Sequence, residues 1–234
     1  MSGHSHWATI KRKKGTNDQK RGQVFSKLAK AMSLAAKGNA DPETNFKLRL
    51  LMDKARQANM PKENISRAIQ KGSGQAGDDE LEEVVYEGYG PEGVAIIVEV
   101  VTDNRNRTTA EIKNIFEKSG GSLASPGAVA FLFRQRGWLL LAKAGNSEEQ
   151  MLKLIDLGVQ DVDETPEGIE VLTTPALLVQ TKKDLEAAGF QLKQIELIYQ
   201  PVTPIKLDDP QKIVNLFEAL QDHDDVQKVF TSLG

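Results

Sequence analysis

The order of the helices and strands predicted over the last two thirds of the chain constrains its fold more than any other feature of the sequence. Residues 135–200 are predicted to form a strand, a helix, two strands, a helix and a strand, which is the order of a ferredoxin-like unit. Residues 80–134 supply two strands, a helix and a strand, and residues 204–234 supply one helix and one strand. That last pair cannot bury its apolar faces alone, so we expect it to complete the earlier piece.

This reasoning predicts a discontinuous α/β domain, residues 80–134 plus 204–234, with a ferredoxin-like domain, residues 135–203, inserted in it. In the discontinuous domain we expect a hairpin around the turn "GPEG". A helix should follow, with Thr108 as its N-cap and Glu111 completing a capping box. The apolar run "GAVAFLF" is predicted to be a further strand.

The first third of the chain is predicted to be helical. Apolar residues recur at helical spacing over residues 17–38, 41–59 and 61–72, and Asp41 followed by Pro42 is a good start for the second helix. We therefore predict a flexible basic arm over residues 1–20 and a helical bundle over residues 21–75. The fold class is then a multi-domain α+β protein, with an N-terminal three-helix bundle followed by two α/β sandwich domains, one of them ferredoxin-like and inserted in the other.

Charge is segregated along the chain. Residues 1–72 hold 16 Lys and Arg against 5 Asp and Glu, a net charge of +11, whereas the remaining residues hold 14 against 28, a net charge of −14. Five acids cannot neutralise sixteen bases, so we predict that this segment binds nucleic acid. An acidic protein surface and a merely solvated helical surface are the alternatives. The predicted contacts are Lys11, Arg12, Lys13, Lys14, Lys20, Arg21, Lys27 and Lys30.

Two further features of the sequence leave alternatives open. Trp7 can stack on a base or dock on the bundle. The stretch "TDNRNRTT" places Arg105 and Arg107 beside a helix N-terminus, where they can bind a phosphate. The same two arginines can instead pair with Glu99 or Glu111 of their own domain.

Several classes of protein are disfavoured. The chain has no cysteine, which excludes disulfides, thiolate zinc sites and cysteine nucleophiles. No apolar run is long enough to span a membrane, and no signal peptide is recognisable. The run "DHDD" at residues 222–225 could hold a cation but is more often a solvated turn. We expect a cytoplasmic monomer that is not an enzyme and has no catalytic residues, cofactor, metal or small-molecule substrate.

Four motifs resemble the signatures of the YebC-like family of probable transcriptional regulators, which includes the mitochondrial translational activator of cytochrome oxidase. They are "GHSHWATIKRKKGTNDQKRG", "KARQANMPKENISRAIQKG", "YEGYGPEGVAIIVE" and "VTDNRNRT". The resemblance covers essentially the whole chain. It implies three domains, the middle one discontinuous, and a cytoplasmic, non-enzymatic role linked to nucleic acid. His6 and Thr9 stand where the family usually has a lysine and an asparagine, which leaves the functional branch open.

Two functions follow from these observations. The first is a transcriptional regulatory protein that binds duplex DNA through its basic arm and helical domain, and the second is a ribosome-associated translation factor. The second would bind ribosomal or transfer RNA and help with difficult stretches such as consecutive prolines. The physical argument reaches nucleic-acid binding by residues 1–72, and the preference for DNA comes from the resemblance.

Overall fold

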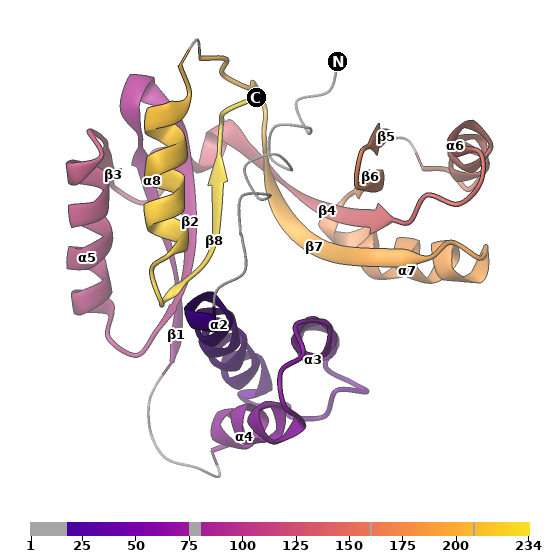
Figure 1. Cartoon of the computed structure of the whole chain (residues 1–234), viewed down its shortest axis with the longest axis horizontal. Helices are drawn as coiled ribbons and strands as arrows, with labels where there is room; N and C mark the ends of the chain where they lie inside the picture. The colour runs from indigo at the N-terminus through magenta and orange to yellow at the C-terminus, as the bar shows by residue number, and fades with distance from the viewer. Residues whose placement is uncertain (1–17, 75–80, 160, 208) are drawn as a thin grey trace.

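The computed structural model describes residues 18–74, 81–159, 161–207 and 209–234, with side chains from residue 21 onward. Figure 1 shows a group of helices beneath two sheets that carry their own helices. The predicted α+β class is confirmed. Among the described residues, no helix is long and apolar enough to cross a membrane.

Three helices form the described N-terminal part, residues 18–74, which we call the helical segment: α2 (Asp18–Ala36), α3 (Phe46–Gln57) and α4 (Lys62–Gly72). Their shared core contains Met32, Ala36, Leu48, Ala55, Met60, Ile65 and Ala68. Ser33 of α2 donates a hydrogen bond of 2.7 Å to the carbonyl of Ala68. At Gly72 a Cβ atom would lie 2.0 Å from the carbonyl oxygen of Ser33, so the end of α4 approaches α2 as closely as only glycine allows.

The prediction that the second helix starts at Asp41 is wrong. Helix α3 starts at Phe46, and its N-cap is Asn45, whose side-chain oxygen accepts from the backbone N–H of Leu48 at 3.0 Å. The Asn45 amide also donates to the carbonyl of Ala35 at 2.6 Å, which ties the cap to the end of α2. Asp41 instead accepts from the backbone N–H of Glu43 and stabilises the preceding turn.

The first sheet has the strand order β3-β1-β2-β8 and is antiparallel throughout. Its strands are β1 (Glu82–Tyr89), β2 (Ala95–Thr102), β3 (Ser122–Ala124) and β8 (Val226–Thr231). Helices α5 (Arg105–Lys118) and α8 (Gln211–Gln221) lie together on one face of it (Figure 1). Phe116 and Phe217 from these helices are fully buried against the sheet. The last helix and strand of the chain thus share a core with the hairpin, although they follow it by about a hundred residues in sequence.

The second sheet has the order β5-β6-β4-β7 and is also antiparallel. Its elements are β4 (Phe133–Leu141), α6 (Ser147–Asp156), β5 (Asp161–Thr165), β6 (Gly168–Thr173), α7 (Leu178–Ala187) and β7 (Leu192–Pro201). This sequence of elements is the predicted ferredoxin-like order. Leu139, Leu154, Ile169 and Leu185 are among the residues that fill the core between this sheet and its helices. The boundaries proposed between domains stay a prediction, and the one between residues 134 and 135 falls inside β4.

The two sheets pack against each other through a core of their own. Ile97 and Phe230 of the first sheet meet Trp138, Leu140 and Ile198 of the second. The rings of Tyr199 and Phe230 make an edge contact with centroids 5.2 Å apart. This shared core fixes the position of β7 beside β8, where Lys228 of β8 donates to the carbonyl oxygen of Leu197 of β7 at 2.9 Å.

Two other local predictions are wrong. The N-cap of α5 is Asn104, not Thr108, because the Asn104 side chain accepts from the backbone N–H of Arg107 at 3.1 Å while Thr108 is buried in the first turn. The run "GAVAFLF" is a turn and a short 3-10 helix (Ala130–Leu132), with β4 beginning only at Phe133. The reason is the buried carboxylate of Glu87, which accepts hydrogen bonds from the backbone N–H groups of Gly127, Val129 and Ala130.

Candidate nucleic-acid interface

The predicted contacts of the basic arm, and Trp7 with them, lie outside the residues that the structure describes. This applies to Lys11, Arg12, Lys13 and Lys14, and to the side chain of Lys20, which belongs to α2. Arg21 is exposed on α2, with its guanidinium carbon 5.8 Å from the centroid of the Phe25 ring. The structure therefore places Arg21, Lys27, Lys30, Arg105 and Arg107 and leaves the arm as a prediction.

Lys27 and Lys30 face the end of α8 instead of open solvent. Lys27 donates from Nζ to the carbonyl oxygen of Gln221. The ammonium of Lys30 lies 2.5 Å from Oδ1 of Asp225. One turn before them on the same face of α2, Gln23 donates to the carbonyl oxygen of Asp222 at 3.3 Å.

The end of α8 is chemically suited to this contact. The last carbonyls of a helix have no partner within it and carry the negative end of the helix dipole. The run Asp222, His223, Asp224 and Asp225 follows directly and adds three carboxylates. The cationic face of α2 and the anionic end of α8 therefore attract each other, although the residues in contact are 194 and 195 positions apart in the sequence.

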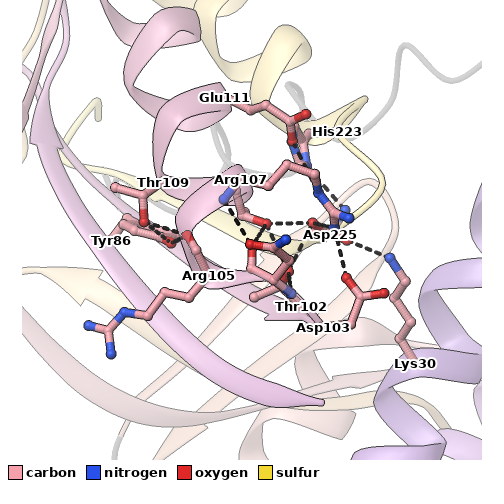
Figure 2. Close-up of polar contacts among 12 residues, drawn as sticks. Lys30, Tyr86, Thr102, Asp103, Arg105, Arg107, Thr109, Glu111, His223 and Asp225 are labelled. Carbon is pink, nitrogen blue, oxygen red and sulfur yellow. Dashed lines mark hydrogen bonds and ion pairs between the residues drawn. The ribbon is translucent and has the colours of Figure 1, made fainter. Parts of the chain in front are cut away.

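The stretch "TDNRNRTT" begins a helix instead of forming a loop, and it supplies a second cation to the same acid. Nη2 of Arg107 lies 2.9 Å from Asp225 and 2.9 Å from Asp103, and Nε lies 3.9 Å from Glu111 (Figure 2). Hydrogen bonds to Asp225 and Asp103 raise the pKa of Arg107. Of the two acids that the sequence suggested as partners, only Glu111 is near, and it is the most distant of the three.

Asp225 is therefore the junction of four elements. It is 2% exposed and precedes β8. Its Oδ2 accepts from Thr108 at 2.7 Å and from Thr102 at 3.2 Å, in addition to the contact with Arg107, while Oδ1 meets Lys30 from α2. Burial would raise the pKa of Asp225, but the hydrogen bonds from Lys30, Thr108 and Arg107 outweigh burial and hold the pKa far below its ordinary value.

Glu111, His223 and Asp225 are close enough to be considered as metal ligands, since their donor atoms lie within 4.8 Å of one another. The hydrogen bonds argue otherwise. The backbone N–H of Asp225 donates to Nδ1 of His223, so in the neutral ring Nε2 carries the proton and donates to Glu111 at 2.9 Å. Asp225 already meets two cations, so the three groups form an internal network and we assign no ion to them.

Arg105 differs from Arg107 although both lie in the first turn of α5. Its guanidinium is exposed, points away from the network around Asp225 (Figure 2), and makes no ion pair with any residue that the structure describes. Its carbonyl accepts a hydrogen bond of 2.7 Å from Thr109, which fixes the backbone of this turn. The backbone of Arg105 is thus held in place, while its guanidinium is exposed.

Three cations of the helical segment are exposed in the same way. Lys37, Lys62 and Arg67 have exposed side chains and no ion pair within the described part of the chain. None of them is among the predicted contacts. The sequence shows that these three residues are basic. It does not show that they lack an acidic neighbour in space, which is what distinguishes them from Lys27 and Lys30.

On its other side the helical segment is tied to both sheets. Lys47 of α3 lies 3.1 Å from Glu83 of β1, and Lys54 lies 2.5 Å from Glu196 of β7. Phe46 and Leu50 of α3 pack against the core of the second sheet and its helices. The sheets and their helices therefore engage at least four of the sixteen bases of residues 1–72, and two of these four, Lys27 and Lys30, are among the contacts predicted for an external partner.

The chain is similar to known proteins over its full length. Residues 5–75 match the family described as "TACO1/YebC protein N-terminal domain", and residues 81–233 match "TACO1/YebC second and third domain". A protein of Persephonella marina named "Probable transcriptional regulatory protein" is 47% identical over 99% of this chain and 95% of its own length. A protein of the same name from Dictyoglomus thermophilum is 46% identical over 99% of this chain and 95% of its own.

A solved structure has the same fold. The crystal structure of a conserved hypothetical protein from Aquifex aeolicus superimposes with a TM-score of 0.89. The two sequences are 41% identical, and the match covers 98% of this chain and 97% of that one.

Proposed function

This chain belongs to the TACO1/YebC family, and from that premise we propose that it is a transcriptional regulatory protein that binds DNA mainly through its basic N-terminal arm and helical segment. One observation carries the proposal: sixteen of the 30 Lys and Arg of the chain stand in its first 72 residues, beside only five acids. The names of the relatives agree with regulation and do not specify the nucleic acid.

The described cations divide into two sets with different uses. Lys37, Lys62, Arg67 and Arg105 are exposed and without acidic partners among the described residues, so phosphates can reach them directly. Lys27, Lys30 and Arg107 are engaged with the end of α8 and with Asp225. The proposed interface combines the arm with the first set.

Recognition in this proposal is mainly of the phosphate backbone. On the face of α2 that carries them, Lys27 and Lys30 contact Gln221 at the end of α8 and Asp225 beyond it, so these two side chains are not presented to a major groove. Contacts to phosphates position a protein without reading the bases. Engagement of about five phosphates predicts a slope near −4 to −5 in a plot of log K against log salt concentration.

A binding measurement with matched variants tests the proposal. In one variant Lys11, Arg12, Lys13 and Lys14 are replaced by Ala, and in the control four exposed lysines of the acidic part, Lys153, Lys183, Lys206 and Lys212, are replaced by Ala. We expect the first variant to bind duplex DNA more weakly, with a salt slope shallower by about 3.6 because four phosphate contacts are lost at about 0.9 each, and the control to keep both the affinity and the slope. Equal losses would show that net charge alone drives binding, and no binding by the unsubstituted chain would refute the proposal.

The alternative function is that of a translation factor whose positive charge would bind RNA instead of DNA. A translation factor would bind structured ribosomal or transfer RNA, which proteins recognise largely by shape and backbone. Competition of duplex DNA with transfer RNA for the unsubstituted chain separates the two functions. Stronger binding to RNA at every salt concentration would favour the translation factor.

A further inference from the structure

The α2 face made by Gln23, Lys27 and Lys30 and the α8 end made by Gln221, Asp222 and Asp225 form one contact, which we call the latch. Two of its acceptors are backbone carbonyls and the third is a carboxylate. All three acceptors are oxygen atoms on an anionic surface. The acceptors of a phosphate backbone are also oxygen atoms that carry negative charge. The end of α8 thus offers α2 the same kind of acceptor that a nucleic acid would offer.

A phosphate cannot use the two lysines while the latch is closed. The side chain of Lys30 is 24% exposed, and that of Asp225, directly beside its ammonium, is 3% exposed. A phosphate that approached Lys30 would meet the carboxylate of Asp225 and the negative end of the α8 dipole. Like charges at such short distances repel, so a phosphate and the end of α8 cannot occupy the two lysines at the same time.

The latch can also open without leaving a buried charge alone. When Lys30 leaves, Asp225 keeps the guanidinium of Arg107 and the hydroxyls of Thr102 and Thr108. A buried carboxylate that loses its last cation is strongly destabilised, whereas one that retains an arginine is not. The contacts of Asp225 with Arg107, Thr102 and Thr108 therefore keep its carboxylate paired when the contact with Lys30 is broken.

We propose that the end of α8, residues 221–225, competes with nucleic acid for Lys27 and Lys30, so that the closed latch masks part of the basic surface and binding opens it. This inference rests on the proposed function and concerns the regulation of the same surface. Indiscriminate binding to polyanions is weakened because an anion that uses Lys27 or Lys30 must first displace an internal one. The acidic run "DHDD" then acts as an internal competitor, not as a cation site.

The chain offers a direct test because it contains no cysteine. Cysteines introduced by Q23C and D222C are then the only two thiols, and a bifunctional methanethiosulfonate reagent joins them by bonds that a reductant releases. The control pair is K113C and E117C, two exposed residues one turn apart on α5 and away from the latch. The probe is a fluorescein-labelled duplex DNA.

With the latch locked, we expect DNA affinity to fall about tenfold and the salt slope to shrink by about 1.8, since two phosphate contacts are lost at 0.9 each. Reductant should restore both, and the control crosslink should change neither. Unchanged affinity and slope in the locked protein would overturn the inference while leaving the proposed function intact. If the protein without crosslinker does not bind DNA, the proposed function fails and the inference fails with it.

Discussion

The ammonium of Lys30 lies 2.5 Å from a carboxylate oxygen of Asp225, a residue 195 positions further along the chain. This ion pair joins the helical segment to the residue directly before β8. It also gives the acidic part of the chain a specific use, because its carboxylates hold cations that would otherwise be open to any polyanion. The predictions below follow from this relationship and from the packing around it.

Replacing Lys30 by Met should destabilise the protein by about 1 to 2 kcal/mol. A hydrogen bond to a charged group contributes in this range, and Asp225 keeps Arg107 as a partner. Urea unfolding measures the change. Lys37→Met, directly after the end of the same helix, is the control, since Lys37 is exposed and makes no ion pair with a described residue; it should stay within about 0.5 kcal/mol. Equal losses in the two variants would contradict the assignment.

Replacing Asp225 by Asn should destabilise the protein by about 3 kcal/mol or more, because it removes the charge that both Lys30 and Arg107 face. Thermal and urea unfolding measure this change. Asp224→Asn removes the same charge one residue earlier, at an exposed position, and should have little effect. A small effect of Asp225→Asn would mean that Asp225 is not the junction described above.

Stability should fall in acid below about pH 4. Burial would raise the pKa of Glu87, but three backbone N–H donors lower it, and the cations and hydroxyl around Asp225 lower its pKa more strongly. A carboxyl with a lowered pKa in the fold stabilises it above its unfolded pKa, about 4, and this stabilisation is lost as pH falls toward the folded pKa. Burial, opposed by Lys228, raises the pKa of Glu99, so its contribution has the opposite sign.

The measurement is the urea midpoint as a function of pH for the unsubstituted chain and for Asp225→Asn. The acid limb should be flatter in the variant, because one of the groups with a lowered pKa is absent. Parallel curves for the two proteins would contradict the role given to Asp225.

Two glycines should respond to alanine in opposite directions. Gly22→Ala lies in α2 with no atom within 4 Å of the new Cβ, so it should stabilise the protein by up to about 1 kcal/mol. Gly72→Ala places its Cβ 2.0 Å from the carbonyl oxygen of Ser33 and should destabilise by about 1 to 3 kcal/mol. Denaturant unfolding measures both changes in stability. An unchanged free energy of unfolding for Gly72→Ala would show that α2 and α4 do not pack as closely as described.

Substitution of Arg105 should affect DNA binding and not stability, whereas substitution of Arg107 should lower stability. Arg105→Gln removes an exposed guanidinium, so we expect unchanged stability and a salt slope for DNA smaller by about 0.9. Arg107→Gln removes two hydrogen bonds of 2.9 Å and should lower stability instead. The same fluorescence titration and urea series measure both variants, and a reversal of the two effects would contradict the placement of these side chains.

Local signals predicted much of the fold. The hairpin formed by β1 and β2 follows from its turn, and the elements of the second sheet follow one another in the order that the sequence predicted. Near α5 the local signals were ambiguous, because Asn104 and Thr108 are both good caps. Tertiary contact decided between them, since Thr108 is buried beside Asp225. The strand predicted in "GAVAFLF" failed for a similar reason, as Glu87, about 40 residues earlier, takes its N–H groups.

The candidate site was less predictable than the fold. Sequence identified Lys27, Lys30 and Arg107 as bases, but whether a base is free depends on acids that lie near it in space. For Lys30 that acid is 195 residues away, and for Arg107 it is 118 residues away. Contacts at such separations leave no periodic pattern in the sequence. The exposed bases Lys62 and Arg67 could be selected only once these pairs were known.

The measurement that tests the central claim most directly is in-cell crosslinking of the tagged chain, with sequencing of both the DNA and the RNA recovered. We expect discrete promoter-proximal DNA peaks with little RNA, and their loss when Lys11, Arg12, Lys13 and Lys14 are replaced by Ala. Crosslinks confined to ribosomal or transfer RNA would contradict the account and identify a translation factor instead.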